Sequence, residues 1–197
     1  LHWYNSTYGS NPPSAAVATV LKSYLSSGGS VHFQQDYGKT PYDVWYMEIM
    51  NDRISSTVGG GGLTTGLALG YSGSWNINSS ATNSINIFPY NLGTNIAFDT
   101  GGAIQGLSQS RNRLAYQGGA SDISGMVSVA AFSEADMNGN TGRITYLGDA
   151  GNFGGSQQTD KNMLLAKNLQ NFLLPPSKCS APLEAVNDTG AANSLTG

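Results

Sequence analysis

Two aspartates stand where a catalytic or metal-binding carboxylate is often found. Asp149 lies on a glycine-rich turn directly after an apolar run that predicts a buried strand, and Asp36 follows another such run. Ligands of open α/β sheets bind beyond the carboxyl ends of the strands, so both carboxylates are ligand-binding candidates. Asn5 and Tyr37 would join them if the first residues form a strand. The structural alternative is that Asp149 accepts backbone N–H groups and fixes its own turn.

The two histidines, His2 and His32, are the side chains that could supply a general base. Both fall within predicted strands, and a hydrolytic triad would need one imidazole beside a positioned serine and a carboxylate. The sequence has no Gly-x-Ser-x-Gly turn to display a nucleophilic serine. The alternative function kept open is therefore a secreted hydrolase that acts on a glycan or peptide through Asp36, Asp149 and a histidine.

A second group of oxygen-bearing side chains has the spacing of a calcium loop. Asp136, Asn138 and Asn140 occupy positions 1, 3 and 5 of such a loop. An EF-hand would need glycine at position 6 and glutamate at position 12, where this chain has Thr141 and Leu147. The pattern therefore indicates a hairpin turn, with a weak calcium contact as the alternative.

Two aromatic residues could form a contact surface. Tyr71 and Trp75 lie among glycine, serine and asparagine, in the stretch GYSGSWNIN. Exposed aromatic rings of this kind can stack against a sugar or contact another protein. The alternative interpretation is that Trp75 is a buried residue of an inserted segment.

The composition restricts the class of protein. The chain has 197 residues, 39% hydrophobic and only 11% charged, with 26 glycines and a net charge of −3. Nine basic residues form no basic stripe, so we expect no nucleic-acid partner. No apolar run approaches the roughly 20 residues of a membrane span, so we expect no membrane insertion. A single cysteine, Cys179, excludes an internal disulfide and a multi-cysteine metal site, and we expect no cofactor.

The same composition, poor in lysine and rich in asparagine, serine, threonine and glycine, is typical of bacterial extracellular proteins. The chain begins at Leu1 with no signal peptide, so we interpret it as a processed or excised piece of a longer protein. These features predict a secreted or cell-surface location.

The elements that would position these side chains follow from apolar periodicity. Helical spacing is present in three segments, 14–29, 40–54 and 159–174. Strands are predicted over 1–4, 30–36, 126–132 and 142–149. The alternation of strand and helix at the start favours a parallel sheet, and Asn138-Gly139 predicts a hairpin between the last two strands. Residues 57–126 are predicted to form an irregular, β-rich insertion.

Two of these segments resemble a known family. The stretch LKSYLSSGGSVHFQQD resembles the helix, double glycine and strand of class I glutamine amidotransferase-like domains. The stretches GRITYLGDAGNF and TDKNMLLAKNLQNFLL resemble the closing unit of the non-catalytic relatives found in gliding-motility-type transport systems and bacterial envelope proteins. The residues that carry this second match are Gly142, Arg143, Gly148, Asp149, Asp160 and Asn162. The resemblance covers roughly 1–54 and 127–174.

The resemblance implies the fold without the amidotransfer chemistry. The enzymes of the family carry a cysteine nucleophile on a sharp turn, whereas Cys179 lies in the tail. The expected fold is therefore a three-layer α/β domain over 1–174, with a mainly parallel central sheet and flanking helices. Residues 175–197 are expected to be an extended linker, and their last part, APLEAVNDTGAANSLTG, is similar to junctions between β-sandwich domains of bacterial surface adhesins.

These inferences together predict a non-enzymatic structural or binding module of a bacterial surface or extracellular protein. Its role would be adhesion, self-assembly or glycan recognition. The expected partners are other domains of the same parent chain or further copies of itself, with a glycan as a candidate ligand.

Overall fold

The computed structural model describes residues 2–5, 14–35, 42–67, 73–78, 85, 89–98, 102–117, 126–148 and 160–174. The helices are α1 (Ala15–Ser26), α2 (Tyr42–Arg53) and α3 (Asp160–Leu173), with short 3-10 turns η1 (Ser56–Val58), η3 (Ser110–Asn112) and η4 (Glu134–Asp136). The strands are β1 (His2–Asn5), β2 (Ser30–Gln35), β3 (Thr64–Leu67), β4 (Gly73–Ile77), β5 (Asn95–Phe98), β6 (Gly102–Gln105), β7 (Arg113–Gln117), β8 (Val127–Phe132) and β9 (Arg143–Leu147).

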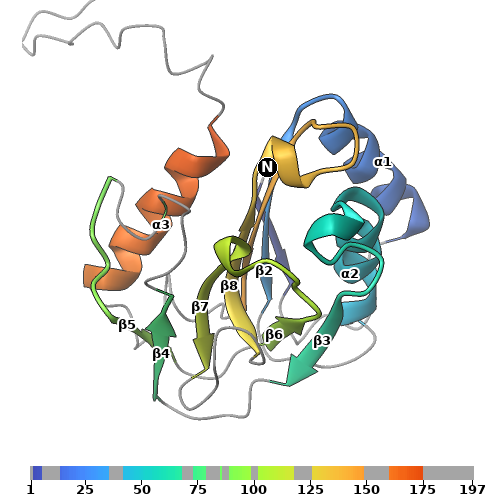
Figure 1. The fold of residues 1–197 in the computed structure, drawn as a ribbon. Coiled ribbons are helices and arrows are strands. Elements are labelled where there is room, and N and C mark those ends of the chain that lie inside the picture. Colours follow the sequence, from blue (N-terminus) through green and yellow to red (C-terminus); the bar gives the residue numbers. More distant parts are fainter. Residues whose placement is uncertain are drawn as a thin grey trace, which may run out of the picture.

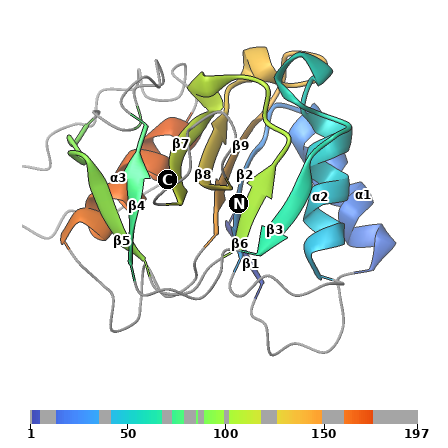
Figure 2. The same cartoon turned by 60° about the horizontal axis from the view of Figure 1, so that its bottom comes forward.

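The strands of the described residues form one nine-stranded sheet (Figure 1, Figure 2). Its main path runs β1-β2-β9-β8-β7-β4-β5, and β3 joins through β6, which pairs with β8. Only the β1–β2 and β2–β9 pairs are parallel, and the other six pairs are antiparallel. The prediction of a three-layer α/β fold with a mainly parallel central sheet is therefore wrong.

The physical reason lies in residues 57–126. This segment does not stay outside the sheet, because it supplies β3, β4, β5, β6 and β7. A parallel pair needs a crossover of a dozen or more residues, usually a helix, whereas an antiparallel pair needs only a short turn. The described part of the segment contains no α-helix, and each of its strands pairs antiparallel with its neighbours.

Helices cover the two faces of the sheet unequally. α1 and α2 lie on one face and α3 lies on the other (Figure 1). β8 serves both cores, because Ala130 and Phe132 contact the α1/α2 core while Val129 and Ala131 contact the α3 core. No helix in the described part of the chain combines the length and the apolar character needed to cross a membrane.

The double glycine after α1 has a clear structural cause. Gly28 adopts a φ of 89°, in the left-handed region, and its N–H and that of Gly29 donate to Leu25 and Tyr24 carbonyls. A Cβ on Gly29 would lie 2.4 Å from the Tyr24 ring. The helix therefore ends where the sequence predicts, and the chain turns directly into β2.

The predicted hairpin between β8 and β9 is confirmed, since the two strands pair antiparallel. The connection begins with η4 and then turns at Asn138-Gly139, where Gly139 has a φ of 81° and Asn140 a φ of 52°. The N–H of Asn140 closes this turn on the Met137 carbonyl at 3.0 Å. The turn is thus built by residues that tolerate a left-handed backbone.

Candidate functional site

The predicted site at the carboxyl ends of the parallel strands is described only in part. Asp36, Tyr37, Tyr71 and Asp149 lie outside the described residues. Asn5 is the last residue of β1 and lies beside Gln35, the last residue of β2. Because β1, β2 and β9 run parallel, their carboxyl ends share one edge of the sheet.

The described part of this edge is filled by close packing. The Tyr146 hydroxyl donates to Gln35 Oε1, and both side chains are buried. The N–H of Gly102 donates to the Gly148 carbonyl. A Cβ at position 148 would lie 1.9 Å from the Gly102 carbonyl oxygen, and one at position 102 would lie 2.3 Å from the Gln35 side chain. The two glycines therefore allow the start of β6 to lie directly against the ends of β2 and β9.

His32 is positioned by the neighbouring strand. Its Nδ1 lies 2.7 Å from Thr145 Oγ1 across the β2–β9 pair, and both side chains are buried. In a hydrolytic triad this ring nitrogen would face a carboxylate that orients the imidazole. Here a threonine hydroxyl takes that position. For His2 the structure describes only the backbone, which pairs with His32 in the sheet.

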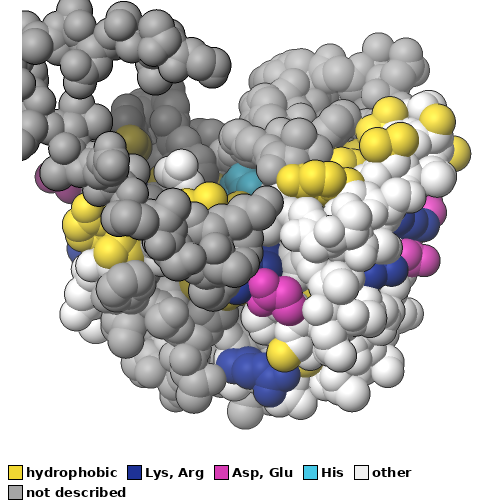
Figure 3. Space-filling model, turned by 90° about the horizontal axis from the view of Figure 1, so that it is seen from above, with side chains coloured by type: hydrophobic (Ala, Val, Ile, Leu, Met, Phe, Trp, Pro, Cys, Tyr) yellow, Lys and Arg dark blue, Asp and Glu magenta, His cyan; other side chains and the backbone are white. Residues whose placement is uncertain are grey.

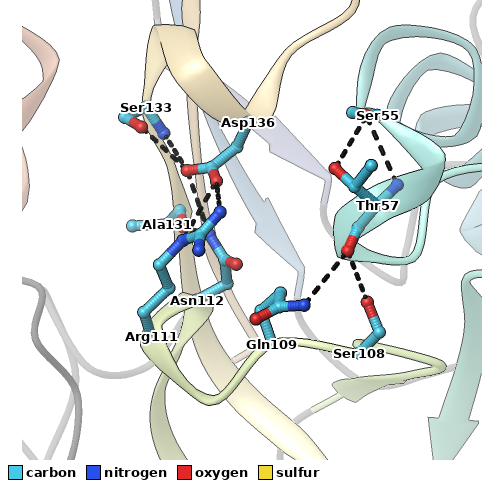
Figure 4. A network of polar contacts seen from close by, with 9 residues as sticks. All are labelled: Ser55, Thr57, Ser108, Gln109, Arg111, Asn112, Ala131, Ser133 and Asp136. Atoms are coloured by element: carbon cyan, nitrogen blue, oxygen red, sulfur yellow. Dashed lines mark hydrogen bonds and ion pairs between the residues drawn. The ribbon is translucent and has the colours of Figure 1, made fainter.

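The most extensively bonded carboxylate of the described residues is Asp136 (Figure 4). It is 3% exposed. Its Oδ1 accepts from Arg111 Nη2 at 2.8 Å, and its Oδ2 accepts from the N–H and Oγ of Ser133 at 2.9 and 2.8 Å and from Asn112 Nδ2 at 3.1 Å. Burial raises the pKa of Asp136, but hydrogen bonds from Arg111, Ser133 and Asn112 outweigh it and hold the pKa below its ordinary value.

This carboxylate joins separate parts of the chain. Ser133 and Asp136 form a capping box around η4, while Arg111 and Asn112 come from η3, which precedes β7. Asn112 Nδ2 also donates to the Ala131 carbonyl of β8 at 2.9 Å. The Asp136 network therefore fixes η3 against the end of β8 and the start of the hairpin.

A second set of polar contacts near this network also binds backbone. The Thr57 carbonyl in η1 accepts from Ser108 Oγ at 3.0 Å and from Gln109 Nε2 at 3.3 Å (Figure 4). Ser55 Oγ accepts from the Thr57 N–H at 3.3 Å. The Ser108 and Gln109 bonds hold η1 to the segment between β6 and η3, so they have the same positioning role as the Asp136 network.

Two of the three calcium candidates are engaged in hydrogen bonds within the protein. Both oxygens of Asp136 are engaged as described, and Asn138 Nδ2 donates to the carbonyls of Asp52 and Ile54 at 2.8 and 3.3 Å. Asn140 supplies the left-handed turn position. In the part of the chain that the structure describes, no group of three or more His, Cys, Asp or Glu side chains could hold a metal ion. The arrangement is that of a hairpin turn attached to the end of α2.

Trp75 does not present an open aromatic face. It lies in β4, is 5% exposed, and belongs to the core on the α3 side of the sheet. Trp75 is therefore a buried residue and not part of an exposed aromatic surface. The Trp75 ring is therefore not open to form a stacking platform with Tyr71, which was the other interpretation.

Arg143, at the start of β9, binds the end of α3. Its Nη1 donates to the Phe172 and Leu174 carbonyls, and its guanidinium lies 5.4 Å from the Phe172 ring centroid. Its Nε donates to Glu134 at 2.7 Å. A cation at a helix C-terminus binds carbonyls that have no partner within the helix. Acidic and basic side chains adjoin one another on the face of the molecule shown in Figure 3.

The pKa of Asp136 leads to a pH prediction. A carboxyl whose folded-state pKa is depressed stabilises the fold above its unfolded pKa, about 3.9, and this stabilisation is lost as the pH falls through the folded-state pKa. We expect the difference in unfolding free energy between the wild type and Asp136→Asn to shrink steadily between about pH 5 and pH 2. Urea titrations at a series of pH values measure it. A difference that is the same at every pH would contradict the assignment.

Part of the Asp136 network was recognisable in the sequence and part was not. Ser133-x-x-Asp136 has the spacing of a capping box, which is a local signal. The calcium interpretation of Asp136 did not take this signal into account. Arg111 and Asn112 are more than 20 positions away, and no local pattern links them to Asp136.

Comparison of the chain with models of known protein families and with curated proteins gave no match.

Proposed function

We propose that this chain is a non-enzymatic structural and binding module of a secreted bacterial surface or extracellular protein, acting in adhesion, self-assembly or glycan recognition. The observation that supports the proposal is that the Asp136 carboxylate is bound by groups of the protein itself. Both of its oxygens accept hydrogen bonds from groups that fix the backbone. A general base needs a lone pair directed at its substrate and a pKa near the working pH. Asp136 has neither, because its pKa is lowered and its oxygens are occupied.

Two asparagines that bind backbone groups, half-buried Asn51 and buried Asn168, support the same interpretation. Asn51 makes a two-way bond with the backbone of Leu63, at 2.9 and 2.8 Å. Asn168 donates to the carbonyls of Ile85 and Tyr90 and accepts from the Tyr90 N–H. Neutral amides thus attach loops to helices in a protein with only 11% charged residues. Such bonds satisfy buried backbone groups without burying a charge, which suits a scaffold.

We also propose that this chain is related to non-catalytic glutamine amidotransferase-like domains. The segments that carry the resemblance supply β1, β2, β8 and β9 and the three α-helices, including both parallel strand pairs. The antiparallel strands β3 to β7 lie between those segments. A parallel unit extended by antiparallel strands is compatible with a scaffold role, since the added strands enlarge the sheet and its surface.

One assay separates this proposal from the hydrolase alternative. The full chain is incubated with insoluble peptidoglycan, cellulose and chitin, and both the bound fraction and the soluble sugar or peptide released are measured. Self-association is followed in parallel by analytical ultracentrifugation. We expect retention on a polymer or self-association, with no release above that of buffer. Release of soluble product that disappears in a folded His32→Gln variant would favour the hydrolase.

A further inference from the structure

Asn138-Gly139 is the only Asn-Gly pair in the sequence, and such a pair can react with itself. The backbone nitrogen of Gly139 attacks Cγ of Asn138, and glycine has no side chain to hinder the approach. The new N–C bond closes a succinimide ring, and the side-chain amide nitrogen leaves as ammonia with the proton from the Gly139 N–H. Water then opens the ring at either carbonyl and leaves aspartate or isoaspartate at position 138.

The structure places this pair at the surface, inside a closed turn. Asn138 and Gly139 are both exposed, and the Asn140 N–H donates to the Met137 carbonyl at 3.0 Å. Gly139 has a φ of 81°, whereas the φ of Asn138 is not positive. This combination defines a type II turn, in which the ψ of the first central residue is about 120°. At that ψ the Gly139 nitrogen points away from the Asn138 side chain, so the ring can close only after the turn opens.

The side chain of Asn138 also attaches the hairpin to the end of α2. Its Nδ2 donates to the Asp52 carbonyl at 2.8 Å and to the Ile54 carbonyl at 3.3 Å. Arg53 Nη2 donates to the Asn138 carbonyl at 2.8 Å. An ionised carboxylate has no donor, so neither product of the reaction can make the two side-chain bonds. Isoaspartate also lengthens the main chain by one methylene, which displaces the carbonyl that Arg53 binds.

We propose that Asn138 is a site of spontaneous deamidation, that opening of the 137–140 turn sets its rate, and that the product weakens the attachment of the β8–β9 hairpin to α2. Opening a surface turn costs less free energy than unfolding the whole domain, so the folded protein reaches the reactive geometry. The loss of ammonia makes the change irreversible, so modified molecules accumulate with age. The inference goes beyond the proposed function and does not depend on it, because it needs no ligand and no partner.

The first test follows the reaction in the full-length wild type. The protein is incubated in a mildly alkaline buffer, folded or unfolded in urea, and peptide mass spectrometry measures the aspartate and isoaspartate formed at position 138 over time. Asn171, which is exposed and precedes Phe172, is the internal reference. Asn138→Gln is the matched control, because its longer side chain closes a ring much more slowly. Arg53→Ala removes one of the bonds that hold the turn.

We expect the product at position 138 to form faster than at Asn171 in the folded protein, but at least about tenfold more slowly than in the unfolded chain. Arg53→Ala should raise the rate in the folded protein at least about threefold, the effect of one lost hydrogen bond. No product at position 138 of the folded protein, after the unfolded chain has converted, overturns the proposed site. Equal rates in the folded and unfolded chains overturn the role of the turn.

The second test measures the consequence for the hairpin. Asn138→Asp reproduces one product, and we expect it to raise the equilibrium constant of unfolding at least about tenfold, as the loss of two hydrogen bonds does. Asn140→Asp adds the same charge to the same turn at an exposed position and should change the constant by less than about threefold. Equal effects of the two variants overturn the proposed weakening of the hairpin attachment. If Asn138→Asp does not fold, urea unfolding of the aged wild type against fresh protein decides the same point.

Discussion

Replacing Asp136 with alanine will lower the free energy of unfolding by about 2–4 kcal/mol, because it leaves buried hydrogen-bond donors without an acceptor at a cost of about 1–3 kcal/mol for each group. The substitution leaves the Ser133 N–H and Asn112 Nδ2 without their acceptor and removes the carboxylate bound by Arg111. It also breaks the connection between η3 and the β8–β9 hairpin. Urea denaturation at neutral pH, followed by circular dichroism, gives the value.

The matched control is Glu134→Ala in the same 3-10 turn. Glu134 pairs with Arg143, but its side chain is 38% exposed, so we expect a loss of at most about 1 kcal/mol. Equal losses for Asp136→Ala and Glu134→Ala would mean that the Asp136 network is no more important than a surface ion pair.

The second large effect is expected in the core beneath α3. Leu165 is completely buried against the sheet, in the same core as Leu147 and Leu169. Leu165→Ala should cost about 2–5 kcal/mol, as large-to-small changes in a packed core do. Gln170→Ala, at an exposed position of the same helix, should change stability by less than about 0.5 kcal/mol. Thermal and urea unfolding that is unchanged in Leu165→Ala would show that α3 does not pack as described.

Leu21→Ala is the counterpart in the core on the other face, where Leu21 of α1 is buried. A cost of about 2–5 kcal/mol is expected there as well. If both variants unfold in one transition with unchanged cooperativity, the two cores belong to one folding unit. This would follow from β8, which contributes side chains to both.

The elements that could be predicted are those with a local signal. Helical periodicity placed all three α-helices, and the positive φ of Gly28 explains why the first of them ends at the double glycine. Periodicity was less reliable for the helix face. Val20 of α1 is 65% exposed, whereas Leu21 and Leu25 of the same helix are buried.

The mixed sheet could not be predicted from local patterns. β3 to β7 are only four or five residues long. The segments between them are rich in glycine, serine and asparagine. The pairing of these strands depends on partners distant in sequence, as in the β3–β6 pair, where Thr64 lies opposite Gln105. Trp75 illustrates the difficulty, because its polar neighbours indicated exposure while cross-strand packing buries it.

Of the candidate site, too, one part could be predicted from the sequence and another could not. The turn at Asn138-Gly139 was predicted because its chemistry is local. The role of Asp136 was not predicted, since an acid followed by two asparagines at alternate positions has the same spacing in a calcium loop and in a hairpin. The structural role of Asp136 comes from Arg111 and Asn112, which approach it from another part of the chain.

The measurement that tests the non-enzymatic assignment most directly compares the wild type with the double variant Asp36→Asn/Asp149→Asn. Both proteins are checked for a cooperative unfolding transition and then assayed for release of soluble sugar or peptide from peptidoglycan, cellulose and chitin. The assignment predicts that both proteins release product only at the rate seen in buffer, and that the double variant differs from the wild type in stability alone. Measurable turnover by the wild type that is absent from the folded double variant would contradict the assignment and establish a hydrolase.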